Sequence, residues 1–415
     1  MEQLFLVDQD RLYTYSELLS DIQAKQTYSP YVFVKNNEPY AIFLAIVHSL
    51  VHGHAIEVLD GDFSEQELSA LGIDSVGLFA EFPVQQPLAV TDIADLCMRI
   101  KQNQAWSATL LTSGTTGRPK KVIHTLETLT RTAKINERFR QHVWAFAYNP
   151  THMAGLQVFF QALLNQNTIV YAFDGRQKQL AALMNDFSIT HLSATATYYR
   201  NVMPYLRGSV YPAVRAITFG GEKYDVQLEQ QIFELFPNAR IRNIYASTEA
   251  GSLFTADGDR FEIEKTIAHL IRFSDDNELL LHRSLLGGSD TYALEGDWYS
   301  TGDIVERAED GSFTFVSRQS EFINIGGYKV NPSEVENVLM QVPGVLNLLV
   351  KAKANRVTGH ILVAEVVKDE LFEETALKKA IKQYAAEHLQ EWKVPRIIHI
   401  VDEIAGSRTG KKVRA

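Results

Sequence analysis

Short runs of β-branched and aromatic residues alternate along this chain with longer stretches of helical periodicity. The strand-like runs occupy residues 31–35, 168–173, 216–219 and 240–245, and helical patterns lie among them at residues 156–164 and 227–236. A strongly apolar stretch at residues 41–52 is typical of a buried helix. Because strands that alternate with helices form parallel sheets covered by helices, the sequence predicts a layered α/β fold with mostly parallel sheets.

The chain has 415 residues, which is too many for one compact core, so two or more domains are expected. Near residue 317 the sequence becomes polar, and Asn331 and Pro332 then carry the start signals of a helix. Strands at residues 345–351, 360–367 and 396–401 and a helix at residues 373–389 follow. The sequence therefore predicts a large N-terminal domain over residues 1–316 and a small, mobile α+β domain over residues 317–415.

Composition narrows the class of protein. The formal net charge of −10 argues against nucleic acid as the main partner. The single cysteine, Cys97, excludes an internal disulfide framework and disfavours a metal–thiolate site. The first residues do not have the pattern of a signal peptide, and the longest apolar stretch, residues 41–51, is too short to span a bilayer. We therefore expect a cytoplasmic enzyme with no membrane span.

A loop rich in hydrogen-bond donors follows the strand-like run at residues 108–111. It contains Thr112, Ser113, Gly114, Thr115, Thr116, Gly117, Lys120 and Lys121. Its glycines let backbone N–H groups approach a bulky anion, and its hydroxyls and lysines add donors and charge. It is not a Walker A loop, because no Gly-Lys pair is followed by Ser or Thr. A polar surface loop is the alternative, but the ordered spacing and the trailing Pro-Lys-Lys favour a polyphosphate ligand.

Four further clusters have the composition of binding loops. Gly220, Gly221 and Glu222 directly follow a strand-like run, and so does the cluster of Tyr245, Ala246, Ser247, Thr248 and Glu249. Residues 299–303 have the character of a turn, and residues 407–412 form a Gly, Ser and basic tail. In open α/β sheets the loops at the carboxyl ends of the strands gather around the ligand. We therefore expect these clusters to meet in one site.

Together these segments resemble the adenylate-forming superfamily, which includes acyl- and aryl-CoA synthetases, peptide-synthetase adenylation domains and firefly luciferases. The resemblance runs in order from about Ala108 to Arg414, and residues 112–121, 245–249, 299–303 and 322–336 are its most specific parts. In that family a carboxylate attacks the α-phosphate of ATP, which gives an acyl-adenylate and pyrophosphate, and a thiol then accepts the acyl group. The resemblance thus implies an ATP-dependent, AMP-forming acid–thiol ligase.

The resemblance also implies roles for individual residues in the nucleotide site. Ser113 to Thr116 would hold the β- and γ-phosphates, with Lys120 or Lys121 nearby. Glu249 would bind Mg²⁺, which prefers oxygen ligands, and Thr248 would touch the α-phosphate. Asp303 would accept hydrogen bonds from the ribose hydroxyls with help from Arg318. Tyr245 would stack on adenine, beside Ala246, Ser247, Gly220, Gly221 and Glu222.

Further roles concern the acid, the thiol and the moving domain. Lys411 would bridge the carboxylate and the α-phosphate, although its neighbour Lys412 could be confused with it. His152 would gate the acyl pocket, with a histidine that merely begins a helix as the alternative. Ser320 would be the hinge. Gly326 and Gly327 would face the site in a second pose, where the thiol arm passes close to the backbone.

The sequence also departs from the family pattern in ways that concern the substrate. Ala246 replaces the usual glycine, so we expect a narrower acyl pocket. Residues 146–157 contain no acidic side chain, which disfavours an amino acid. The expected substrate is a small aryl or short to medium acyl carboxylic acid, and the expected acceptor is coenzyme A or the phosphopantetheine arm of an acyl carrier protein. A nucleotide-binding relative without turnover is the alternative from another class.

Overall fold

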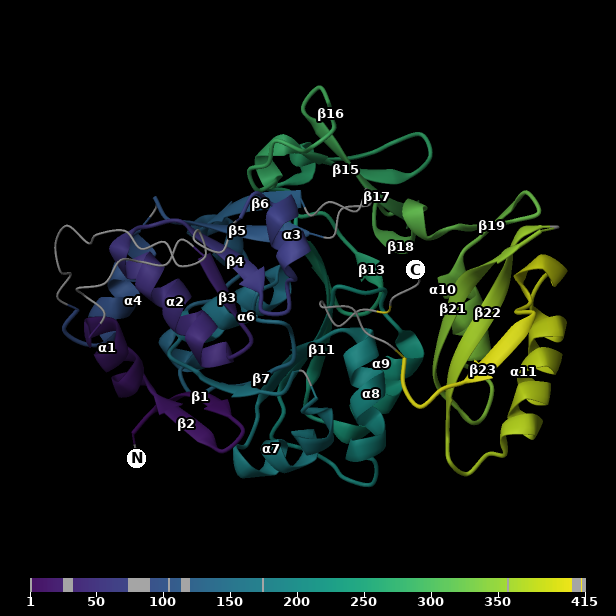
Figure 1. Ribbon diagram of the computed structural model, residues 1–415, viewed down its shortest axis with the longest axis horizontal. Coiled ribbons are helices and arrows are strands. Elements are labelled where there is room, and N and C mark those ends of the chain that lie inside the picture. Colours follow the sequence, from purple (N-terminus) through teal and green to yellow (C-terminus); the bar gives the residue numbers. More distant parts are fainter. Residues whose placement is uncertain are drawn as a thin grey trace.

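The computed structural model describes residues 2–24, 33–73, 90–103, 105–112, 120–173, 175–356, 358–404 and 412. Figure 1 shows a large layered part and a smaller unit beside it, formed by the last quarter of the chain. None of the helices in the described ranges has the length and apolar character needed to cross a membrane.

An eight-stranded sheet is the centre of the large part, in the order β12-β11-β10-β9-β7-β8-β1-β2. Its strands are β1 (Leu4–Asp8), β2 (Arg11–Thr14), β7 (Val143–Phe146), β8 (Thr168–Tyr171), β9 (His191–Ala194), β10 (Ala216–Gly220), β11 (Arg240–Ser247) and β12 (Gly251–Ala256). Neighbouring strands from β11 to β1 pair in parallel, whereas β2 and β12 pair antiparallel at the two edges. The predicted strands near residues 168, 216 and 240 are confirmed.

A second, four-stranded sheet shares a hydrophobic core with the first. It contains β3 (Phe33–Asn36), β4 (Ile56–Asp60), β5 (Ser107–Thr112) and β6 (Lys120–Thr125). The core between them holds α1 (Tyr15–Ala24), α2 (Pro39–His52), α4 (Ile93–Gln102), α5 (Leu126–Thr130) and α6 (Met153–Leu164). Nearly every residue of α2 is buried, which explains its apolar character all round. Phe43 of α2 stacks on Phe159 of α6 at 4.3 Å between ring centroids and so joins the two helices.

Helices also cover the opposite face of the eight-stranded sheet. These are α7 (Leu180–Asp186), α8 (Ala196–Leu206) and α9 (Val226–Leu235), which share a second core with the strands. The short helix α3 (Glu65–Ala70) belongs to a separate small cluster beside the four-stranded sheet. The predicted buried helix at residues 41–52 and the predicted helices at 156–164 and 227–236 are confirmed, with small shifts of their ends.

A third, antiparallel sheet follows the eight-stranded sheet and was not foreseen. It contains β13 (Arg260–Phe261), β14 (Ile271–Phe273), β15 (Glu278–His282), β16 (Leu294–Glu295), β17 (Trp298–Arg307) and β18 (Phe313–Arg318). The cluster at residues 299–303, expected as a turn, lies inside β17, so that prediction was wrong. Gly302 nevertheless lies at a local irregularity of β17, because it has φ +76° and the register of β17 with β15 shifts between Ser300 and Ile304.

The C-terminal unit has a hydrophobic core of its own. Its elements are β19 (Ile323–Ile325), β20 (Tyr328–Val330), α10 (Pro332–Leu339), β21 (Val345–Asn355), β22 (Gly359–Lys368), α11 (Glu374–His388) and β23 (Ile397–Ile400). The expected helix start is present, since Asn331 caps α10 by accepting a hydrogen bond from the backbone of Ser333 at 3.0 Å. Strand β18 ends at Arg318, and the short 3₁₀ turn Gln319–Glu321 leads to the new core. The division near residues 316–320 stays a prediction.

Candidate active site

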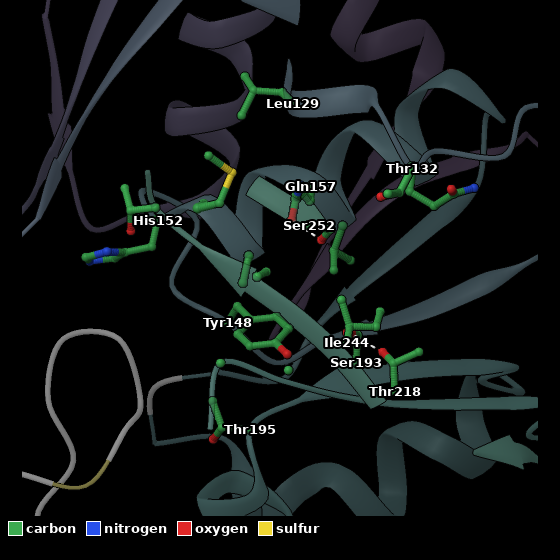
Figure 2. A pocket seen from close by; sticks show the side chains of 18 of the residues that line it. Leu129, Thr132, Tyr148, His152, Gln157, Ser193, Thr195, Thr218, Ile244 and Ser252 are labelled. Carbon is green, nitrogen blue, oxygen red and sulfur yellow. Dashed lines mark hydrogen bonds between the residues drawn. The ribbon is translucent and has the colours of Figure 1, made fainter. Parts of the chain in front are cut away.

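A cavity of about 200 Å³ opens beside the carboxyl ends of β9, β10 and β11. One wall comes from strands of the eight-stranded sheet and carries Trp144, Ser193, Thr218 and Ile244, and the facing wall comes from α6 and its surroundings (Figure 2). The lining on that side consists of Leu129, Thr132, Ala133, Met153, Ala154, Gln157, Val158 and Gln161. The cavity therefore lies at the sheet edge where the sequence predicted a ligand.

Six residues predicted from separate motifs line this one cavity. They are His152, Gly220, Gly221, Ala246, Ser247 and Thr248. Gly221 has φ +80°, a backbone conformation that favours glycine. At Gly220 a side chain would approach the Tyr148 hydroxyl to 3.1 Å, so the missing side chain makes room for that hydroxyl. Ala246 lines the cavity, and its effect on the width of the pocket stays a prediction.

The described lining of this cavity carries no Asp, Glu, Lys or Arg side chain. Several of its polar groups pair with one another or with the backbone. The Thr218 hydroxyl donates to Ser193, and the Ser252 hydroxyl donates to Oε1 of Gln157 at 2.8 Å. Gln161 uses both ends of its amide on the backbone of Lys134, at 2.9 Å each. The cavity is thus mostly apolar, and His152 is the titratable imidazole of its described lining.

The turn at residues 248–250 is held by three separate donors. His124 Nε2 donates to the carbonyl of Thr248 at 2.7 Å, the Gly287 amide donates to that of Glu249 at 2.8 Å, and Arg131 donates to that of Ala250 at 3.1 Å. Burial lowers the pKa of His124 to about 4, so the ring is neutral near pH 7. A turn whose carbonyls are all engaged fixes the direction of its side chains.

Glu249 has the surroundings of a carboxylate that can take a cation. Within the described part of the chain its side chain makes no hydrogen bond and no ion pair, and its charge contributes to the raised pKa values of Tyr292 and Tyr299 after the effect of burial. Among the described residues no group of three or more His, Cys, Asp or Glu side chains could hold a metal. A Mg²⁺ ion at Glu249 would thus take most of its ligands from phosphate oxygens and water.

Asp303 connects the eight-stranded sheet to the antiparallel sheet. The Tyr245 hydroxyl donates to its Oδ2 at 2.7 Å, and Arg318 Nε lies 3.2 Å from its Oδ1. Burial, followed by the charge of Asp303, raises the pKa of Tyr245 well above its ordinary range. Phe315 stacks on the ring of Tyr245 at 4.3 Å between centroids. The structure thus brings together three residues that the sequence assigned to the nucleotide.

Part of the predicted phosphate loop lies outside the described residues, namely Ser113, Gly114, Thr115, Thr116 and Gly117. At its ends, the backbones of Thr112 and Lys120 face each other across the β5–β6 pair. Lys120 and Lys121 were expected in the loop but belong to strand β6, so that placement was wrong. The ammonium group of Lys121 forms an ion pair with Glu57 at 2.5 Å.

Lys411 also lies outside the described residues, whereas its neighbour Lys412 is described. The backbone amide of Lys412 donates to Oε1 of Glu222 at 3.1 Å, and its ammonium group donates to Glu336 and to the carbonyl of Leu348. Glu222 also accepts from the backbone and the hydroxyl of Thr197, at 2.7 and 2.9 Å. The carboxylate of Glu222, expected beside adenine, therefore connects the start of α8 to the C-terminal tail.

The predicted glycine pair lies elsewhere. Gly326 and Gly327 have φ +57° and +92° and form the turn between β19 and β20 in the C-terminal unit. Asn324 accepts a hydrogen bond from the Gly327 amide at 3.0 Å. Neither glycine lines the cavity, and Figure 1 shows β19 at the far upper side of the C-terminal unit.

Sequence reasoning missed three residues that organise this site. His124 and Arg131 hold the turn at residues 248–250, and Asp60 contacts His152. A carboxylate at the end of the strand-like run at residues 56–60 was an available signal for Asp60. No motif marks His124 or Arg131, because their partners are backbone carbonyls far along the chain.

Known proteins share both parts of this architecture. The profile of the AMP-binding enzyme family matches residues 46–273, which is more than half of the chain, and the profile of the AMP-binding enzyme C-terminal domain matches residues 334–411. The chain belongs to the AMP-binding enzyme family. This membership confirms the predicted superfamily and the predicted class, an ATP-dependent, AMP-forming acid–thiol ligase.

Individual relatives agree with this assignment. The 2-succinylbenzoate–CoA ligase of Listeria monocytogenes serotype 4b is 25% identical over 337 residues, which cover 74% of this chain and 68% of the relative. The o-succinylbenzoate coenzyme A synthetase MenE from Bacillus subtilis, in complex with ATP and magnesium ion, has a TM-score of 0.68 at 20% identity, over 100% of this chain and 96% of that one. A variant of E. coli MenE with bound OSB-AMS has a TM-score of 0.72 at 19% identity, over 96% and 91%. The predicted fold class is thereby confirmed.

Proposed function

We propose that this enzyme activates a small monocarboxylic acid with an uncharged aryl or medium-length acyl tail and transfers the acyl group to coenzyme A. The observation that carries this proposal is the cavity bounded by α6 and strands β7, β9, β10 and β11, because its described lining carries no Asp, Glu, Lys or Arg. Its position beside Thr248 is where the acid's carboxylate would meet the α-phosphate.

Charge is the first argument about the acid. The name 2-succinylbenzoate, which describes the substrate of several relatives, denotes an acid with two carboxyl groups. One carboxylate would react, and the second would lie in the cavity. Moving an unpaired carboxylate out of water costs several kcal/mol or more, the described lining carries no Lys or Arg to compensate it, and its one imidazole, His152, is already engaged by Asp60. We therefore place this enzyme among ligases for acids with a neutral tail.

Size and polarity are the second argument. An apolar protein cavity of about 150 Å³ accepts benzene, so a cavity of about 200 Å³ has room for one substituted ring or a short chain. Trp144, Met153 and Ile244 supply apolar surface. The hydroxyls of Thr218 and Ser252 are already paired, whereas the buried Nε2 of Gln157 has no partner among the described residues and could donate to one polar atom of the tail.

The nucleotide would bind between the cavity and the antiparallel sheet. Asp303 would accept from the ribose hydroxyls while Arg318 and Tyr245 hold its carboxylate in place. Glu249 would ligate Mg²⁺, which when bound neutralises phosphate charge during the transfer. With Phe315 on one face of its ring, Tyr245 would offer adenine its other face, beside Ala246, Ser247 and the glycines at 220 and 221.

We propose Lys411, and not Lys412, as the lysine of the adenylation step. Lys412 is 8% exposed and its ammonium group is used by Glu336 and Leu348, so it has no freedom to reach a substrate. The backbone amide that joins the two lysines is bound to Glu222, directly after the cavity residues Gly220 and Gly221. This contact favours a pose of the C-terminal unit that suits adenylation.

Coenzyme A is the proposed acceptor because the relatives' names specify it, and a carrier-protein arm is the alternative. A cytoplasmic location, expected from the sequence, suits a reaction that consumes ATP. The presence of Glu249 and Lys411, a metal ligand and a lysine needed for the chemical step, argues against a relative without turnover.

A pyrophosphate exchange assay with a panel of acids tests this proposal. The panel should include substituted benzoates, medium-chain fatty acids, 2-succinylbenzoate and amino acids. We expect exchange with neutral-tailed acids to exceed exchange with 2-succinylbenzoate at least tenfold. Preference for the dicarboxylic acid or for an amino acid would overturn the proposed substrate class, and no exchange with any acid would favour the non-catalytic alternative. Acyl transfer to coenzyme A and to a phosphopantetheinylated carrier protein then identifies the acceptor.

A further inference from the structure

His152 and Asp60 form an ion-pair contact at the rim of the cavity. Nε2 of His152 lies 3.1 Å from Oδ1 and 3.2 Å from Oδ2 of the carboxylate. Asp60 ends strand β4 of the four-stranded sheet, whereas His152 immediately precedes α6, so the contact joins two layers of the large part. In Figure 2 the imidazole lies at the edge of the cavity and points away from Ser193 and Thr218.

Asp60 is fixed more firmly than a helix start requires. Its side chain is 7% exposed, and its Oδ1 accepts hydrogen bonds from Asn149 at 2.9 Å and from the Thr151 hydroxyl. Although burial acts to raise the pKa of Asp60, the hydrogen bonds and charge of His152, together with Thr151 and Asn149, hold it below its ordinary value. The carboxylate is therefore ionised at neutral pH, and its oxygens are committed to these donors.

The side chain of His152 does not cap α6, so the contact is not explained as a helix signal. When the ring is neutral, a carboxylate at Nε2 selects the tautomer with its proton on Nε2. Nδ1 then carries the lone pair, and it makes no hydrogen bond to another described residue. Asp60 is the charged group within ion-pair distance of His152 among the described residues. A held imidazole with one open nitrogen is the arrangement of a general base.

We propose that Asp60 positions His152 to accept the thiol proton in the second half-reaction. This inference rests on the proposed acyl transfer to coenzyme A. The proton of the S–H bond moves to Nδ1 of His152, and the sulfur electron pair forms the C–S bond at the acyl carbonyl. The C–O bond to the phosphate breaks and AMP leaves with its electron pair. The proton on His152 then passes to solvent, which restores the neutral ring.

The experiment separates the two half-reactions in Asp60→Asn and in His152→Gln. Pyrophosphate exchange measures adenylation, and single-turnover transfer from the preformed adenylate to coenzyme A measures the second step between pH 6 and 9. We expect transfer to fall about 10- to 100-fold in Asp60→Asn and by about 100-fold or more in His152→Gln, with a much smaller change in exchange. The rising limb of the pH profile, which reports the base, should change in Asp60→Asn, because an amide binds the imidazole differently from a carboxylate. In His152→Gln the pH profile of transfer should lose its rising limb.

Two controls distinguish the proposed base role from a purely structural role of Asp60 and His152. Asp257→Asn changes an equally acidic but exposed residue, paired with Arg240 on the surface, and should leave both half-reactions and the pH profile unchanged. A selenol analogue of pantetheine is already ionised at neutral pH, so both site variants should transfer to it at the wild-type rate. If Asp60→Asn does not fold, the pH profile and selenol results of His152→Gln decide alone.

The outcomes separate this inference from the proposed function. Equal losses in both half-reactions, or an undiminished loss with the selenol, would overturn the base role. If the wild-type enzyme exchanges pyrophosphate but transfers only to a carrier protein, the proposed acceptor is wrong. Transfer to the phosphopantetheine arm of the carrier protein then tests the roles of His152 and Asp60 in the same two variants. Transfer to coenzyme A with unchanged rates in both variants would overturn this inference alone.

Discussion

The ammonium group of Lys412 lies 3.1 Å from Oε2 of Glu336, with the two side chains only 8% and 7% exposed. The same lysine gives its backbone amide to Glu222 of the large part. One residue near the end of the chain thus contacts both parts of the protein, and burial lowers the pKa of its ammonium group although Glu336 opposes this shift.

Lys412→Met should lower the free energy of unfolding by about 3–5 kcal/mol, because it removes the ammonium group that pairs with the buried Glu336 carboxylate. Urea unfolding measures this loss. Adding Glu336→Gln should restore much of the stability, since glutamine is neutral and can still accept from the Val350 amide, as Glu336 does at 2.8 Å. A double variant as unstable as the single one would show that the ion pair is not the cause.

Lys411→Ala should reduce adenylate formation by about 10²–10³ and spare transfer from a supplied acyl-adenylate. The expected reason is that this charge stabilises the transition state of the first step only. Pyrophosphate exchange and single-turnover transfer give the two rates. If Lys411→Ala keeps its exchange activity and Lys412→Ala loses it at unchanged stability, then Lys412, and not Lys411, is the lysine of the adenylation step.

Glu249→Gln should strongly weaken the Mg²⁺-dependent reaction and leave folding nearly unchanged. A carboxylate that only capped a helix would show the opposite pattern, with about 1 kcal/mol of lost stability and near-normal activity. The melting temperature and the Mg²⁺ dependence of exchange, measured on one preparation, distinguish the two patterns. Asp257→Asn, a surface carboxylate variant, is the matched control.

Ser320→Pro should retain one half-reaction, which we expect to be adenylation, and lose most of the other. Proline fixes φ and removes a donor, so a hinge in the turn Gln319–Glu321 could no longer absorb the torsion change. Exchange and transfer rates are compared with those of the wild type. Loss of both to the same degree at unchanged stability, or loss of neither, would argue against a hinge here.

His124 should make the protein sensitive to acid. Burial lowers its pKa from 6.5 to about 4 in the folded state, so between these values the unfolded chain binds a proton that the folded chain does not. Stability is therefore complete above about pH 6.5 and falls towards pH 4, by up to roughly 3 kcal/mol at about 1.4 kcal/mol per pKa unit. In His124→Gln the difference in unfolding free energy between pH 7.5 and 5 should shrink. An unchanged difference would show that His124 does not cause the acid sensitivity.

The sequence predicted the α/β layers, and it predicted that the clusters at residues 220–222 and 245–249 lie in one site. Both predictions depend on local patterns. Strand runs such as residues 216–219 are β-branched and end in glycines, and glycines at strand ends indicate a ligand. The antiparallel sheet was not predicted, since strands such as β13 and β16 are two residues long and derive their stability from their neighbours.

The failures in the site have the same physical origin. Lys121 looked like part of a phosphate loop, but the register of β5 with β6 turns it towards Glu57. Asp60 and His152 are about ninety positions apart, and only the packing of two sheets brings them together. Contacts of this kind depend on the tertiary structure and leave no periodicity in the sequence.

Arg318 is the last residue of β18, and the proposed hinge at Ser320 follows after one intervening residue. Its guanidinium is held by Asp303, the residue proposed to bind the ribose. Occupancy of the nucleotide site and rotation of the C-terminal unit would therefore act on the same short piece of backbone. By thermodynamic linkage, the orientation of the C-terminal unit that ATP favours must bind ATP more tightly than the other orientation does. The affinity for AMP should depend on the orientation of the C-terminal unit in the same way. Nucleotide titration is thus a route to the energy difference between the two poses, without any label on the moving unit.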